Sequence, residues 1–271
     1  MKKTLIALAV VASAVVSGSA MADGWVEGGI TDSIDMGGSI ISEQPVWMWQ
    51  INKNVSDSMN LNVSNAVVSN SQNVWSNVGD AFPILLGKTK FAYSNVSSGM
   101  SPIITYGGEG FAIKSPVDDA PTITLQATGK TDPSKVGQFK FKMNMYSLVS
   151  MLWKGNGVTT QDKDTYQMIA DTSKVYGNGY FQNAGYVKTM TTDDVKDQLT
   201  RILGGEMISI ADTKVSTPTY TGPNLFDTAN AYNVEGVYAS EYVANSGTLS
   251  FPVDGTPEDW KATLNVTVSY Q

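Results

Sequence analysis

The sequence contains neither cysteine nor histidine in its 271 residues. Without cysteine no disulfide can form, so stability must come from a buried core or from an external partner. Without histidine, the chain cannot build Ser-His-Asp or Cys-His nucleophilic groups, histidine general bases or the usual zinc sites. We therefore predict a protein that is not an enzyme, with no catalytic residues, no metal site and no cofactor.

Positive charge is also scarce. Lysine and arginine together number 18 against 25 acidic residues, which gives a formal net charge of −7, and Arg201 is the single arginine. An acidic chain of this composition makes a poor nucleic-acid binder. We therefore exclude nucleic acid as a partner.

Acidic pairs are the only hint of acid/base or metal chemistry. A glycosidase needs two carboxylates that face each other across a cleft, which a sequence cannot show. The plainer interpretation is that these carboxylates cap helices and occupy turns, so a secreted carbohydrate-active enzyme is the weakest alternative. The residues concerned are Asp118, Asp119, Asp162, Asp164, Asp193 and Asp194.

Residues 1–22 have the layout of a cleaved secretory signal. Two lysines precede an apolar run over residues 5–12, which is followed by a break at 17–18 and small residues at Ala20 and Ala22. The apolar run is too short to span a membrane. We therefore predict a signal peptide, an exported protein and a mature chain that begins at Asp23.

Short alternating runs of apolar and polar residues recur from about residue 40 onward, separated by Gly, Pro, Asn and Ser. They predict a mainly β protein, a mostly antiparallel sandwich or barrel whose sheets bury one face. The clearest run places Phe139, Phe141, Met143 and Met145 on one face of a strand. Further strands are predicted at residues 59–63, 102–106, 121–125 and 247–251.

The final stretch, residues 260–271, alternates most regularly, with Leu264, Val266, Val268 and Tyr270 on its apolar face. Outer-membrane barrels also end on such a strand, but they need many long strands, whereas these are short and are interrupted by helical segments. An exposed strand edge instead invites pairing with another chain. We therefore predict that this strand accepts a partner strand.

A second alternating stretch supplies the partner. Within residues 23–40, Ile30, Ile34 and Met36 share one face, and Asp32 lies on the same face, where a carboxylate is costly unless it is paired or at a rim. Such a strand can be inserted into an incomplete sandwich of the next subunit. The sequence thus predicts a donor-strand extension over 23–40, a body over 41–271 and a head-to-tail polymer of identical chains.

Helical spacing interrupts the β pattern at about residues 150–215, which we interpret as an inserted subdomain with two short helices. One covers residues 191–203 and begins with a capping-box pair, Thr191 and Asp194. The other is predicted over residues 164–177, with Asp164 as its N-cap.

The same insertion interleaves aromatic and polar residues. Sugars stack on aromatic rings and bind amide and charged groups, so we predict a glycan site here, although any single ring is more often a packing residue. The predicted glycan-binding residues are Trp153, Tyr166, Tyr176, Asn178, Tyr180, Phe181 and Tyr186.

Six stretches, in order along nearly the whole chain, resemble the major subunits of the K88 (FaeG-like) family of adhesive fimbriae of enterotoxigenic Escherichia coli. They are DMGGSI followed by WMW, then PILLGKT, KGNGVT, DDVKDQLTRI and LNVTVSY. The resemblance implies an incomplete immunoglobulin-like β-sandwich, a pilin whose open groove is covered in turn by a periplasmic chaperone and by the donor strand of another copy.

The resemblance also implies assembly through an outer-membrane usher, passage through the periplasm and a location in a surface fimbrium. In this family the major subunit is itself the adhesin, and its inserted subdomain binds carbohydrate of host glycoproteins or glycolipids. It therefore favours a major structural subunit that binds host glycoconjugates. A minor subunit, at the tip or as initiator, is the alternative.

Overall fold

The computed structural model describes residues 46–52, 57–93, 102–114, 120–153, 164–169, 191–207, 214–215, 220–221 and 231–270. All of them belong to one compact unit, Gln44–Gln271. The strands are β1 Trp47–Ile51, β2 Val67–Ser69, β3 Gln72–Val78, β4 Phe82–Thr89, β5 Pro102–Gly107, β6 Ala112–Lys114, β7 Thr122–Gly129, β8 Val136–Trp153, β9 Asp164–Ile169, β10 Lys214–Val215, β11 Tyr220–Thr221, β12 Ala231–Tyr242, β13 Gly247–Pro252, β14 Trp260–Ala262 and β15 Asn265–Tyr270. The helices are α1 Thr192–Leu203 and the short 3-10 turns η1 Asp57–Met59, η2 Val63–Asn65, η4 Gly204–Met207 and η6 Val253–Gly255.

The long strand β8 organises the larger sheet. Its first part pairs antiparallel with β7 and β13, and its second part pairs antiparallel with β12 and β9. Phe139, Phe141, Met143 and Met145 are all buried on one face, as their alternation predicts. The main path of this sheet runs β1-β4-β12-β8-β13-β3-β2.

A second, two-stranded sheet consists of β5 and β15. It packs against the larger sheet, and Ile104 and Tyr106 from β5 enter the main core. The hydroxyl of Tyr106 lies 2.9 Å from that of Tyr238 and donates to Ser240 Oγ at 2.8 Å, which fixes β5 on β12. The predicted antiparallel β-sandwich is confirmed, and so are the strands at β5, β7, β8 and β13.

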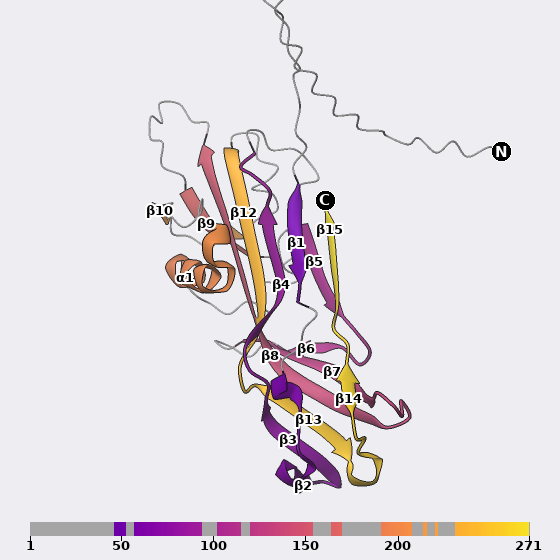
Figure 1. Ribbon diagram of the computed structural model, residues 1–271. Coiled ribbons are helices and arrows are strands. Elements are labelled where there is room, and N and C mark those ends of the chain that lie inside the picture. The colour runs from indigo at the N-terminus through magenta and orange to yellow at the C-terminus, as the bar shows by residue number, and fades with distance from the viewer. Residues whose placement is uncertain are drawn as a thin grey trace, which may run out of the picture. The chain divides into compact units, whose positions relative to one another are not determined.

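Helix α1 covers the opposite face of β8 and β12, and Figure 1 shows it on the side of the sheet away from β5 and β15. Val195 and Leu199 are fully buried there against residues of both strands. Thr191 and Asp194 form the capping box, and Gly204 is the C-cap, so the helix predicted over 191–203 is confirmed.

Arg201 anchors α1 to β12. Its two terminal nitrogens donate to the two carboxylate oxygens of Glu241, at 2.9 and 2.6 Å. The side chain of Glu241 is 7% exposed and that of Arg201 is 52% exposed. A carboxylate this buried needs a charged partner, so the sole arginine stabilises the seating of the helix.

The predicted strand over residues 260–271 is divided into β14, which pairs with β7, and β15, which pairs with β5. Two further predicted elements are wrong. Residues 164–169 form strand β9 rather than a helix, because the edge of β8 offers backbone partners and both Thr165 and Tyr166 become buried by pairing there. Residues 59–63 are not a strand: Asn62 accepts a hydrogen bond from the amide of Ser64 and caps η2, a local bond that competes with strand pairing.

Several predictions fall on residues outside the described part of the chain. These are the signal peptide over 1–22, the donor extension over 23–40 and most of the insertion, whose boundaries stay a prediction. Among the described residues, no helix is both long enough and apolar enough to cross a bilayer.

Candidate functional site

Two strand edges lie beside each other without pairing. In the described part of the chain, β1 pairs only with β4, and β15 pairs only with β5. Between β1 on one side and β14 and β15 on the other lies an open groove of about 630 Å³. Each wall is a strand edge with which no other described strand pairs, and an added strand needs such an edge.

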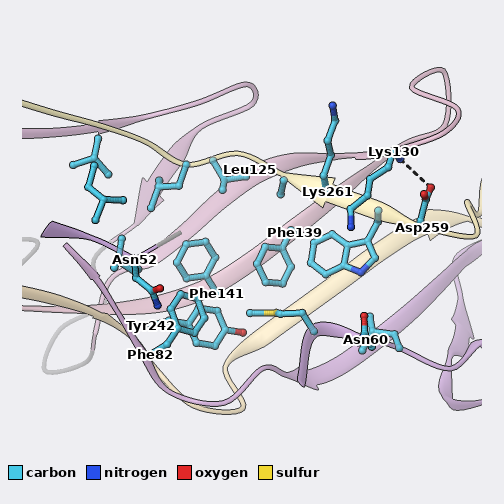
Figure 2. A pocket seen from close by; sticks show the side chains of 18 of the residues that line it. Asn52, Asn60, Phe82, Leu125, Lys130, Phe139, Phe141, Tyr242, Asp259 and Lys261 are labelled. Atoms are coloured by element: carbon cyan, nitrogen blue, oxygen red, sulfur yellow. Dashed lines mark hydrogen bonds between the residues drawn. The ribbon is translucent and has the colours of Figure 1, made fainter. Parts of the chain in front are cut away.

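The floor of the groove is aromatic. Tyr242 stacks on Phe82 with ring centroids 4.9 Å apart and on Phe141 at 5.2 Å, and Phe139 lies 5.0 Å from Trp260. Figure 2 shows Phe82, Phe139, Phe141 and Tyr242 gathered along the groove. Burial raises the pKa of Tyr242 from its ordinary value of 10.0 to about 12, which favours the neutral phenol in the groove floor.

The apolar walls are only partly covered. Ile51 lies on the same face of β1 as Trp47, yet Ile51 is 48% exposed and Trp47 is 6% exposed. On the facing wall, Leu264 and Val266 are half-buried, although alternation puts them on the inner side of the sheet. Inward-pointing apolar side chains that stay exposed are typical of a binding surface.

Trp49 and Tyr270 bound one end of the groove. The indole nitrogen of Trp49 on β1 donates to the hydroxyl of Tyr270 on β15 at 2.7 Å. The Trp49 ring stacks on Trp47, with centroids 5.2 Å apart, and lies directly over Gly87, where a Cβ would overlap it. The sequence WMW and the glycine of PILLGKT therefore act together to place this boundary.

The other end of the groove is charged and open. Lys130, Glu258, Asp259 and Lys261 line it, and Figure 2 shows Lys130, Lys261 and Asp259 at this end. Asp259 accepts hydrogen bonds from the amides of Lys130 and Thr131, each at 3.1 Å. The bonds from Thr131 hold the pKa of Asp259 below its usual value.

The arrangement suits an extended apolar peptide. It combines two open strand edges, an aromatic floor and charges that stand only at one end, which is the geometry of strand addition. Among the described residues, no three Asp or Glu side chains stand close enough to hold a metal ion.

The structure brings the predicted accepting residues together with this groove. Leu264 and Val266 line it, Val268 packs against the main core, and Tyr270 forms the end with Trp49. Their role in accepting a donor strand stays a prediction. The predicted donor residues Ile30, Asp32, Ile34 and Met36 lie outside the described residues.

The predicted glycan site is not assembled within the described residues. Tyr166 is 9% exposed and belongs to the main core, and its hydroxyl donates to Asp164 at 3.2 Å, so this ring packs instead of facing solvent. Trp153 ends β8, and nothing is described of its side chain. Tyr176, Asn178, Tyr180, Phe181 and Tyr186 lie outside the described residues.

Sequence reasoning missed one wall of the groove. Ile51 shares a face with Trp47 and Trp49, so the alternation in WMWQI could have indicated it. Phe82 and Trp260 could not be assigned, because their contribution depends on strands that are distant in sequence. Met59, predicted as part of a strand, lines the groove from a 3-10 turn.

Comparison with known proteins identifies relatives along the whole chain. A model of K88 fimbrial proteins, described as "Fimbrial, major and minor subunit", matches residues 1–271. The chain is 28% identical over 236 residues to the K88 minor fimbrial subunit FaeI of Escherichia coli, with 86% of each chain covered. It is 27% identical over 297 residues to the K88 fimbrial protein AC and 25% identical over 285 residues to the F41 fimbrial protein of the same organism, with 100% of each chain covered.

Proposed function

Because the chain belongs to the family of K88 major and minor fimbrial subunits, which are surface proteins that build fimbriae, we propose that it polymerises by donor-strand complementation. Residues 23–40 of one copy fill the groove between β1 and β15 of the next. The observation that carries this proposal is the groove itself, an aromatic floor between two strand edges that no further described strand covers. The family is structural and gives no positive sign of enzymatic activity.

The dimensions of the two segments support the pairing. Ile30 to Ile40 and Trp260 to Tyr270 contain the same number of residues, and apolar side chains recur at alternate positions in both, interrupted in the first segment by Asp32 and Gly38. A donor in this groove covers Ile51 and Val266 and places apolar side chains on Phe139 and Phe141. Asp32 is compatible with either end, the exposed rim at Tyr270 or the charged end, but not with the aromatic floor.

Before assembly, the same groove needs another occupant. An exported subunit with open edges and an uncovered aromatic floor is prone to aggregate. We assign its protection to a periplasmic chaperone that contacts Leu264, Val266, Val268 and Tyr270, and its delivery to an outer-membrane usher.

A mixing experiment tests donor-strand complementation. A subunit that lacks residues 23–40 is expected to be captured by the chaperone but to form no fimbriae. A synthetic peptide of residues 23–40 should bind this subunit and raise its melting temperature, whereas a peptide with Ile34→Asp and Met36→Asp should not. Normal fimbriae from the deletion variant would refute the assignment.

We further propose that the subunit is a major one and binds host carbohydrate through its insertion. Support comes from the aromatic and polar composition of that insertion, with Tyr166 now assigned to packing. A glycan array with the peptide-complemented subunit tests binding, and Trp153→Ala, Tyr180→Ala and Phe181→Ala variants test the site. If all three variants still bind glycan, these aromatic residues do not form the binding site.

A minor subunit is the second candidate, and the match to FaeI over 86% of both chains favours it. Immunogold labelling separates the two roles. Labels along the whole shaft indicate a major subunit, and labels confined to one end or to rare positions indicate a minor one.

A further inference from the structure

The last strand of the main sheet path is apolar and uncovered on both faces. Val67 and Val68 in β2 are 68% and 65% exposed, and Val63 in the preceding η2 is 66% exposed. We call these three residues the valine edge. Edge strands of soluble proteins usually carry charges or proline that discourage association. Here the chain presents three valines instead.

The valine edge is continuous with the open end of the groove. Met59, Asn60 and Leu61 line the groove, and the chain then passes through η2 into β2. Figure 2 shows Asn60 at the end of the groove where Lys130 and Asp259 lie. The connection is fixed by the buried Trp75, whose indole nitrogen donates to the carbonyl of Asn62 at 2.9 Å.

The short link between the donor strand and the rest of its own subunit, residues 41–45, limits where that subunit can lie. Only residues 41–45 separate the donor segment from Val46 and β1, so its body begins within roughly 20 Å of Ile40. The hydrogen bond between Trp49 and Tyr270 bridges the groove at its other end. The C-terminal end of the donor strand, near Ile40, therefore leaves the groove through its open, charged end.

From this geometry we propose that the valine edge is a second contact between successive subunits, covered by the body of the copy that donates its strand. This inference rests on the proposed donor-strand polymerisation and adds a body-to-body interface to it. The occupant is a second copy of this chain, packed near the start of its β1, where Val46 is 45% exposed. The two surfaces differ, so the contact is heterologous and gives the polymer a direction.

Because the natural chain has no cysteine, single introduced cysteines report on burial. Val68→Cys, Val67→Cys and the control Thr200→Cys, on the exposed face of α1, are each prepared in two forms. One form is assembled fimbriae, and the other is a monomer that lacks residues 23–40 and is complemented with the 23–40 peptide. The rate of maleimide labelling is measured in both.

We expect either valine-edge cysteine to label about tenfold more slowly in fimbriae than in the complemented monomer, because interface cores exclude solvent. The Thr200→Cys control should label at similar rates in both forms. Equal rates for Val67→Cys and Val68→Cys in the two forms would overturn the inference. A failure of donor-strand complementation is distinguished from this outcome, because the 23–40 peptide would then not bind the monomer at all.

Discussion

Ile51 offers the most direct test of the groove, because it is a wall residue that folding itself leaves half uncovered. Its side chain is 48% exposed on the inner face of β1. Full burial of an isoleucine contributes about 1.5 to 3 kcal/mol relative to full exposure, so covering the exposed half contributes about 1 kcal/mol to binding a donor strand. That free energy corresponds to about a fivefold change in affinity.

We therefore expect Ile51→Thr to weaken binding of the 23–40 peptide by about fivefold, judged by lost apolar burial. Ile51→Asp should weaken it by more than about tenfold, since a carboxylate must also lose its water. Both variants should unfold nearly as the natural subunit does when no peptide is present. Isothermal titration calorimetry with the donor peptide measures the affinities.

Met48 provides the matched control. It lies on the same strand, is 45% exposed and does not line the groove. Met48→Thr should therefore leave peptide affinity within about twofold of the natural value. The reasoning is refuted if Met48→Thr and Ile51→Thr weaken binding equally, or if Ile51→Asp binds the peptide as well as the natural chain does.

Three further predictions concern the scaffold. Gly87→Ala should cost about 1 to 3 kcal/mol in urea unfolding, because its Cβ overlaps the Trp49 ring, whereas Gly107→Ala, with open space around it, should cost little; equal losses would contradict this. Arg201→Met should cost about 2 to 3 kcal/mol by leaving Glu241 buried without a cation, and Glu241→Gln should cost less; the reverse order would exclude charge pairing as the cause. Burial raises the pKa of Tyr106 to about 12 from 10.0, so the fold favours the neutral phenol, and its contribution to stability is complete below pH 10 and is lost as the pH rises to 12. The urea midpoint should therefore fall less between pH 8 and pH 11 in Tyr106→Phe than in the natural chain. An equal fall in both proteins would assign the loss of stability at alkaline pH to other groups.

Local signals were sufficient where one segment decides its own structure. Helix α1 was predicted to the residue at its N-cap, because Thr191 and Asp194 satisfy each other within one turn. The core face of β8 was predicted from period-two alternation, because Phe139, Phe141, Met143 and Met145 all enter the main core. In these cases the tertiary structure agreed with the local preference.

Local signals failed where a partner from elsewhere decided the structure. The segment around Tyr166 has helical spacing, but the free edge of β8 offers backbone pairing over four residue pairs, and the segment becomes β9. Residues 59–63 alternate, yet no strand in the described structure pairs with them. Asn62 instead accepts hydrogen bonds from the amide and the hydroxyl of Ser64 within its own turn. The propensity of a short sequence window carries no information on whether a distant strand is available for pairing.

The sequence alone determined the fold class, the absence of disulfide and histidine chemistry, and the two alternating segments from which assembly could be inferred. Those properties depend on composition and on a period of two, which need no distant contact. The tertiary structure decided that Ile51, Phe82 and Trp260 meet beside Val266 in one groove, that Trp49 and Tyr270 bound it, and that the valine edge adjoins its open end. These relations join residues separated by most of the chain, and only the packing of the two sheets brings them together.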